Sequence, residues 1–179
     1  MDNVLVGAVK NRQGELIGAE IRPDAAWFLE TLSRYGDVAL LTSANRTWAN
    51  YVLDELGPAA KFLKNVYTVE DLYPVALALE MIDRAGLSQR DKEELYGQVA
   101  AILPPGVVFD DYPVGSWMYW LKGLATGIAN INPRMWIEVE PFKAGMRDRG
   151  GLRRAFAEFL NRNSEWTGGR SLSGRRRVG

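Results

Sequence analysis

The sequence predicts an α/β fold with a mostly parallel sheet and helices on both faces, and three observations lead to this prediction. The segment "DVALLTSA" (37–44) is a continuous apolar run of strand length, typical of a parallel strand buried on both faces. Apolar residues recur at helical spacing before it, in 25–36, and after it, in 45–58. The alternation then reaches a second apolar run, "GVVFDD" (106–111). This order fits a doubly wound domain, in which the ligand lies at the carboxyl ends of the strands.

The N-terminal residues are expected to form a β-hairpin. The segment "VLVGAVKNRQGELIGAEI" (4–21) has two short β-branched stretches around a turn at Asn11–Gly14. Arg22 and Pro23 follow, and the helix expected over 25–36 ends at Gly36.

The remaining elements complete the predicted organisation. A short strand is expected at 65–69, followed by helices at 74–86 and 88–103, which together form a small helical insert (about 74–103). Beyond the strand at 106–111 we expect a helix at 117–127 and further strands within 128–140. The domain organisation is then an α/β domain over 1–143, a terminal helix over 144–162 and a basic, disordered tail over 163–179.

The composition narrows the chemistry. The 179 residues are 47% hydrophobic and 25% charged, as is ordinary for a soluble globular protein. The chain has no cysteine and no histidine, which excludes disulfides, thiolate or imidazole zinc sites, and nucleophiles activated by histidine. Catalysis would therefore use carboxylates, hydroxyls, lysine or arginine, and a metal would be held by oxygen ligands, as Mg²⁺ is.

The charge is unevenly distributed although its formal sum is zero. Residues 147–179 carry nine arginines against three acidic residues, so the rest of the chain is acidic. We expect weak binding of polyanions by this arginine-rich tail. No segment is apolar and long enough to span a membrane and no signal peptide begins the chain, so a cytoplasmic protein without a membrane partner is expected.

Two strand ends carry the candidate site. "LLTSANR" (40–46) places hydroxyls and backbone N–H groups at the start of a helix, where anions bind. "VFDD" places Asp110 and Asp111 at another strand end, where a divalent cation can bind. An anion site beside a cation site suits phosphoryl transfer, although hydroxyls in such a place are often helix caps and acidic pairs are often solvated turns.

Residues 21–58, "IRPDAAWFLETLSRYGDVALLTSANRTWANYVLDELGP", closely resemble the haloacid dehalogenase-like (HAD) superfamily. The nearest branch is that of the phosphatases of the RNA polymerase C-terminal domain, the NLI-interacting-factor-like proteins. "VVFDDYP" (107–113) is similar to the fourth motif of the family. The resemblance implies a HAD-like Rossmannoid sheet, with the N-terminal hairpin as a flap over the site, and Mg²⁺ as the cofactor.

The resemblance also implies roles for individual residues. "MDNVLVG" is similar to the second half of the first motif, so Asp2 would match the general acid and base and would also lie at the metal. Thr42 would bind the phosphoryl oxygens, and Asp110 would bind the metal with Asp111 beside it. The third-motif lysine would be Lys64, with Lys122 as the alternative.

The first-motif nucleophile would be an aspartate immediately before Met1, and two explanations compete. Either a longer chain exists that carries this residue, or the chain has lost its nucleophile. If "NVLVGAV" itself were the first strand, Gly7 would stand where the aspartate belongs.

If the aspartate before Met1 exists, we expect a magnesium-dependent phosphate monoester hydrolase that acts through a phospho-aspartate on a phosphorylated substrate of unspecified class. A catalytically inactive binding module is the alternative. A nucleic-acid end phosphatase is a third interpretation, suggested by the basic tail and the aromatic residues within 117–120. Those aromatic residues could also pack in the core.

Overall fold

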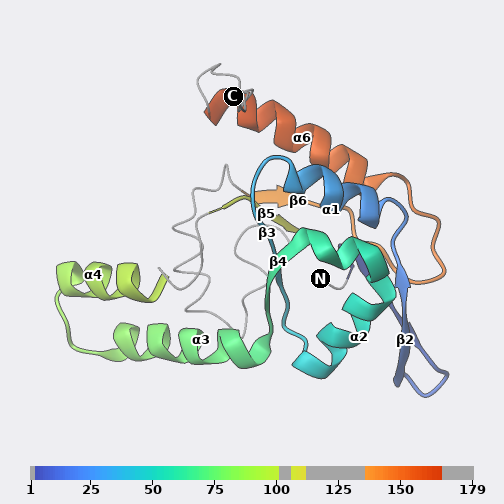
Figure 1. Cartoon of the computed structure of the whole chain (residues 1–179). Coiled ribbons are helices and arrows are strands. Elements are labelled where there is room, and N and C mark those ends of the chain that lie inside the picture. The colour runs from blue at the N-terminus through green and yellow to red at the C-terminus, as the bar shows by residue number, and fades with distance from the viewer. Residues whose placement is uncertain (1–2, 101–105, 112–135, 167–179) are drawn as a thin grey trace.

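The strands of the chain pair two by two. The computed structural model describes residues 3–100, 106–111 and 136–166, and Figure 1 shows their arrangement. Strands β1 (Val6–Lys10) and β2 (Leu16–Ile21) form the predicted antiparallel hairpin. The other two pairs are parallel: β3 (Val38–Leu41) with β4 (Leu63–Tyr67), and β5 (Val108–Asp110) with β6 (Trp136–Glu138).

The mixed α/β class is confirmed, whereas one continuous, mostly parallel sheet is not. Within the described residues the three strand pairs are separate. Residues 3–5, which run from the neighbourhood of Asp111 to the hairpin, form a turn, and Asn3 has a φ of 62°. A left-handed residue interrupts the extended backbone that a strand requires. Val4 and Leu5 thus enter the core without adding a strand to any of the pairs.

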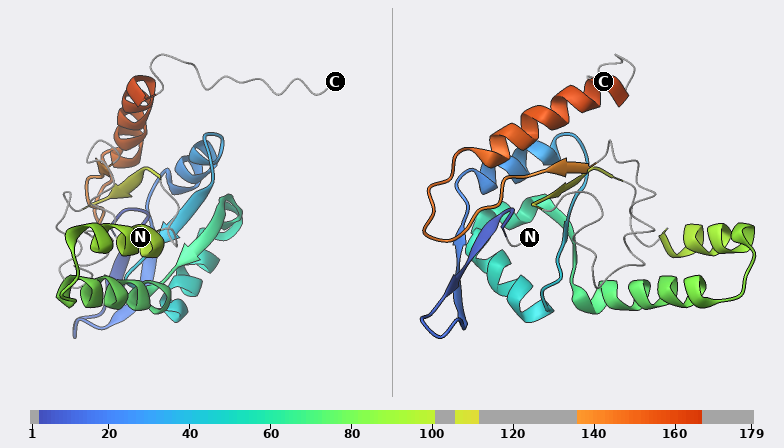
Figure 2. Two further views of the ribbon diagram at one scale, coloured as in Figure 1. Left: turned by 90° about the vertical axis from the view of Figure 1, so that its left-hand side faces the viewer. Right: turned by 180° about the vertical axis from the view of Figure 1, so that it is seen from behind.

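The helices account for most of the described chain. They are α1 (Ala25–Ser33), α2 (Arg46–Leu56), a 3-10 helix η1 (Gly57–Phe62), α3 (Val69–Arg84), α4 (Gln89–Ala100) and α6 (Gly151–Trp166). The further views in Figure 2 show α3 and α4 side by side at one end of the molecule.

Helix α3 begins at Val69, five residues before the start that the sequence predicted. A capping box explains the difference: the backbone N–H of Thr68 donates to Asp71 Oδ2 at 2.8 Å, and the Thr68 side chain accepts from the backbone N–H of Asp71. The helix then continues through Pro74. Pro74 is the sixth residue of the helix and has no N–H to donate to the carbonyl oxygen of Glu70, so one backbone hydrogen bond of α3 is missing there.

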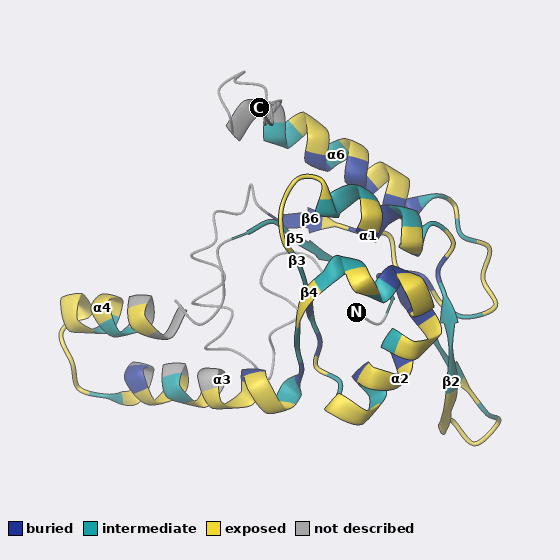
Figure 3. Ribbon diagram, viewed as in Figure 1, coloured by how far each residue is buried: buried dark blue, intermediate teal, exposed yellow. Residues whose placement is uncertain are grey.

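The apolar core lies between the helices and the strand pairs, and Figure 3 shows the buried residues on the facing sides of α1, α6 and β6. Strand β5 is fixed in this core by Phe109. Its ring meets that of Phe28 on α1 edge-on at 5.1 Å and that of Phe159 on α6 at 5.9 Å. Both helices therefore help to hold β5 in place.

Helix α6 is part of this core, and it overlaps the stretch over which the sequence predicts a terminal helix, 144–162. It begins at Gly151 and runs to Trp166, and its buried face consists of Leu152, Ala155, Phe156 and Phe159. That spacing gives one apolar stripe on a helix.

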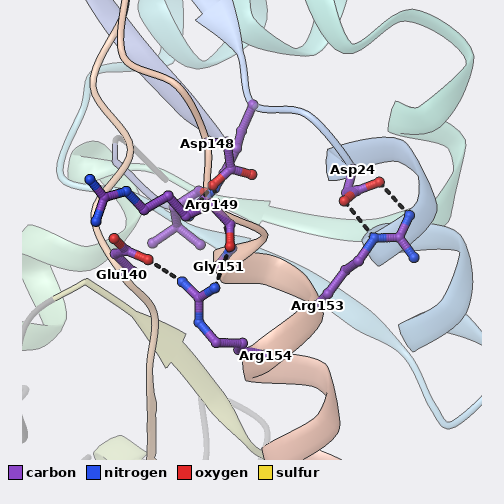
Figure 4. Close-up of polar contacts among 9 residues, drawn as sticks. Asp24, Glu140, Asp148, Arg149, Gly151, Arg153 and Arg154 are labelled. Atoms are coloured by element: carbon purple, nitrogen blue, oxygen red, sulfur yellow. Dashed lines mark hydrogen bonds and ion pairs between the residues drawn. The ribbon is translucent and has the colours of Figure 1, made fainter.

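Three ion pairs fix the start of α6 to other elements. Arg153 donates to both carboxylate oxygens of Asp24 at 2.7 and 2.6 Å, and Arg154 pairs with Glu140 (Figure 4). The third pair joins Asp148, just before α6, to Arg22 at 3.0 Å. The side chains of this last pair are 5% and 0% exposed, so it is the buried one.

Some predicted features lie outside the described residues: the helix at 117–127, the strand at 128–133 and the tail from 167 onward. The division of the chain into domains stays a prediction. In the part that the structure describes, no helix has both the length and the apolar character needed to cross a membrane.

Candidate metal and phosphoryl-binding site

Asp110 and Asp111 lie at the end of β5, as the sequence predicted. Phe109 faces the core, so the strand ends at the protein surface with both carboxylates half-buried. The backbone N–H of Asp111 donates to Asp110 Oδ1 at 2.7 Å, and this bond fixes the Asp110 carboxylate against the backbone of Asp111. Among the ion pairs of the described residues, none includes Asp110 or Asp111.

The environment of Asp110 opposes its ionisation. Burial raises the pKa of Asp110 to about 7, and the hydrogen bond and like charge of Asp111 act in the same direction. A carboxylate pair of this kind needs either a proton or a cation to offset its charge. Oxygen donors of this type suit Mg²⁺.

The third member of the group is Asn3, which the sequence interpretation missed. Its side-chain amide Nδ2 donates to Asp111 Oδ2 at 3.0 Å, across 108 positions of the chain. The only sign in the sequence that Asn3 belongs to the site was its position next to Asp2, a predicted site residue. No local pattern shows which distant carboxylate an amide will contact.

Thr42 lies just beyond the carboxyl end of β3 and is 3% exposed. Its backbone N–H donates to the carbonyl oxygen of Tyr67 at 2.9 Å, and its Oγ1 accepts from the backbone N–H of Ala44 at 3.1 Å. Because the oxygen accepts, its own hydroxyl hydrogen points elsewhere and can be donated. In the described part of the chain, no hydrogen bond joins Thr42 to Asp110 or Asp111.

The start of α2 already holds a carboxylate. Asn45 caps the helix by accepting from the backbone N–H of Trp48 at 2.9 Å. The backbone N–H of Arg46 donates to Glu70 Oε1 at 3.1 Å. The hydrogen bond from Thr68 and then that from the Arg46 backbone hold the pKa of Glu70 below its ordinary value. Part of the helix start predicted to bind an anion is thus occupied by an acidic side chain of α3.

Lys64 lies at the other end of the β3–β4 pair. It is near the amino end of β4, where its Nζ contacts Asp37 Oδ1 at 2.7 Å, and both side chains are exposed. Thr42 follows the carboxyl end of the same pair, about 13 Å away at the usual rise of a strand. The structure does not bring Lys64 to Thr42, and its role stays a prediction.

Two of the predicted site residues, Asp2 and the alternative lysine Lys122, lie outside the described residues. Where side chains are described, no three acidic residues lie close enough together to hold a metal by themselves. The described site thus consists of Asp110, Asp111 and Asn3, whereas Thr42 follows the end of β3, in a separate strand pair.

A comparison with protein families bears on the class of this site. The family model of the NLI interacting factor-like phosphatases matches residues 1–82. This part of the chain is therefore similar to that family, which belongs to the HAD-like superfamily, and the resemblance stated from the sequence is confirmed. The match includes Asp2, Thr42 and Lys64 and ends within α3, before Asp110. No curated protein matches the chain significantly.

The family match supports phosphatase activity in general, and thus a hydrolase. It does not extend to the metal, the nucleophile or the substrate.

Proposed function

We propose that the protein is a magnesium-dependent phosphate monoester hydrolase that acts through a phospho-aspartate. One observation carries the proposal: a half-buried carboxylate pair with a raised Asp110 pKa, in a chain whose first 82 residues match a phosphatase family. Asp110 and Asp111 would hold the ion. Mg²⁺, when bound, would neutralise charge on the phosphoryl oxygens.

The residues of the chain then have separate roles. The Thr42 hydroxyl donates a hydrogen bond to a phosphoryl oxygen, because its oxygen is already oriented by Ala44. In a longer chain that carries it, the aspartate that the first motif implies immediately before Met1 would be the nucleophile. Asp2 gives a proton to the leaving oxygen and later takes one from the water that hydrolyses the acyl phosphate. The third-motif lysine is Lys64 or Lys122, and the substrate is a phosphorylated compound of unspecified class.

A second candidate function is that of a catalytically inactive binding module. The protein would be inactive if β1 corresponded to the strand of the first motif, because Gly7 would then occupy the position of the nucleophilic aspartate. A Cβ atom on Gly7 would lie 2.3 Å from the backbone nitrogen of Ala144, so this position cannot hold an aspartate side chain.

Turnover of p-nitrophenyl phosphate by the protein isolated from its own cells tests the proposal. Asp110→Asn should abolish the turnover that depends on Mg²⁺, while the matched control Asp54→Asn, on the exposed face of α2, should keep it. Undiminished turnover in Asp110→Asn would contradict the metal role of this residue. Absence of turnover in all three proteins favours the binding module.

A further inference from the structure

Asn3 joins three parts of the fold around the carboxylate pair. Its backbone N–H donates to the carbonyl oxygen of Val6 at 2.7 Å, and its own carbonyl oxygen accepts from the backbone N–H of Phe142 at 2.7 Å. The first bond fixes Asn3 to β1, and the second fixes it to the segment after β6. Asn3 is thus held by its backbone before its side chain makes any contact.

The conformation of this backbone restricts which residue fits. The φ of Asn3 is 62°, in the left-handed region, which asparagine tolerates far better than most residues other than glycine. From this fixed position the amide Nδ2 reaches Asp111 Oδ2 at 3.0 Å. If the amide were turned over, its oxygen would face a carboxylate oxygen, so the donor orientation follows from electrostatics.

The contact extends to the second carboxylate through the backbone. The carboxylate of Asp111 accepts a hydrogen bond from the Asn3 amide, and the backbone N–H of Asp111 donates to Asp110 Oδ1 at 2.7 Å. An amide is a neutral donor, so it orients Asp111 without cancelling the negative charge that would attract a cation. A lysine or arginine at this position would cancel that charge.

We propose that Asn3 is a positioning residue of the site: its amide orients the Asp111 carboxylate toward a divalent cation shared with Asp110. The inference rests on the proposed function, because that function places Mg²⁺ at this pair. Partners of this kind, which orient a metal ligand, typically change metal affinity 10–100-fold when removed.

The variant Asn3→Gly tests the effect of the side-chain amide apart from that of the backbone conformation. Glycine adopts the same positive φ without strain, so the variant removes only the side chain. Titration calorimetry with Mg²⁺ alone should show about a 10–100-fold weaker affinity for Asn3→Gly than for the unaltered chain. Asn11→Gly, at the hairpin turn, is the matched control and should leave the affinity unchanged.

A double-mutant cycle distinguishes positioning from general destabilisation. If Asn3 acts through Asp111, Asn3→Gly should cause no further loss of affinity in an Asp111→Asn background. An equal loss in both backgrounds, or an affinity of Asn3→Gly within about twofold of the unaltered chain, would overturn the proposal.

A measurement on the side chain itself covers the case in which Asn3→Gly does not fold. In ¹⁵N-edited spectra the Asn3 side-chain NH₂ should have hydrogen-bonded shifts, and these should move to those of a free amide in Asp111→Asn. Unchanged shifts would overturn the contact. If the unaltered chain itself does not bind Mg²⁺, the proposed function fails along with the positioning role. Binding that survives Asn3→Gly overturns the positioning role alone.

Discussion

At the scale of single residues, two charged groups differ in how their charge is offset. The Asp110–Asp111 pair has no cationic partner among the described residues and a raised Asp110 pKa. The side chain of Arg22 is fully buried, and its charge is offset by the carboxylate of Asp148 at 3.0 Å. The guanidinium also donates to the carbonyl oxygen of Val4 at 3.1 Å, whereas its Nε has no hydrogen-bond partner. The first arrangement suits binding of an ion, and the second holds the fold together.

Arg22→Gln should strongly destabilise the protein, because it leaves the Asp148 carboxylate buried without its cation. Breaking one half of a buried pair typically costs about 3–5 kcal/mol. Urea unfolding measures the change. Arg34→Gln, in an exposed pair with Glu30, is the control and should cost about 0.5 kcal/mol or less. Equal losses in the two variants would contradict the structural role of Arg22.

The same pair predicts a pH dependence of stability. Burial acts to raise the pKa of Asp148, but the hydrogen bond and charge of Arg22, with backbone N–H groups, hold it below its ordinary value. The unfolded chain therefore binds more protons in this range, and stability rises with pH. The contribution is complete above the ordinary pKa of about 3.9 and is lost as the pH falls through the native value.

The free energy of unfolding of Asp148→Asn should therefore fall less steeply than that of the unaltered protein as the pH is lowered. Urea titrations from about pH 5 to pH 2 measure this slope. The exposed control Asp54→Asn should keep the slope of the unaltered protein. A slope in Asp148→Asn as steep as that of the unaltered protein would exclude Asp148 as its source.

Residue contacts were predictable only where they are local. Asp110 and Asp111 follow an apolar strand, and the sequence alone was enough to place them at a strand end. Asn3 with Asp111 and Arg22 with Asp148 are 108 and 126 positions apart. No spacing rule predicts such contacts, because they depend on how the elements pack.

At the scale of elements, the N-terminal hairpin packs closely against the segment after β6, and Gly7 lies at the point of contact. A Cβ on Gly7 would meet the backbone of Lys143 and Ala144 at 2.8 and 2.3 Å. Backbone atoms cannot move aside as the end of a flexible side chain can. The absence of a side chain at this position is therefore a packing requirement.

Gly7→Ala should destabilise the protein by about 1–3 kcal/mol or more, as overpacking does. Thermal or urea unfolding measures it. Gly36→Ala is the control, because no atom lies within 4 Å of the Cβ that it would add. Similar stability of the two variants would show that the close approach does not exist.

The type of each described element was largely predictable, whereas several boundaries were not. Strand β3 is a continuous apolar run, and the helices around it have apolar residues at helical spacing. The start of α3 was predicted five residues too late, at residue 74, because the cap formed by Thr68 with Asp71 lies before that position. Sheet continuity depends on which strands meet, and this is decided by packing rather than by local pattern.

At the scale of the whole molecule, charge is divided between the body and the C-terminal segment. The last 33 residues hold nine of the chain's 22 basic residues, whereas the chain as a whole has equal numbers of each sign. Part of this basic charge is used within the fold, since Arg153 and Arg154 pair with Asp24 and Glu140. Four of the nine arginines lie beyond residue 166, within the predicted tail, and we expect these four to attract polyanions.

Removing residues 167–179 should lower the salt concentration at which the protein elutes from heparin, because fewer cations are released from the polyanion. The thermal midpoint should stay the same, because Phe159, the last buried residue among the described side chains of α6, lies eight residues before the deletion. An unchanged elution would exclude the tail as the polyanion-binding segment. A lower midpoint would show that the tail also contributes to the fold.

The covalent step of the proposed reaction is the central claim, and it can be measured directly. Protein isolated from its own cells would be mixed with Mg²⁺ and substrate, quenched and treated with borohydride, which reduces an acyl phosphate to the alcohol. Peptide mass spectrometry would then locate the reduced residue. If the chain carries the aspartate that the first motif implies immediately before Met1, we predict homoserine in its place. Release of phosphate without any reduced aspartate would contradict the phospho-aspartate route.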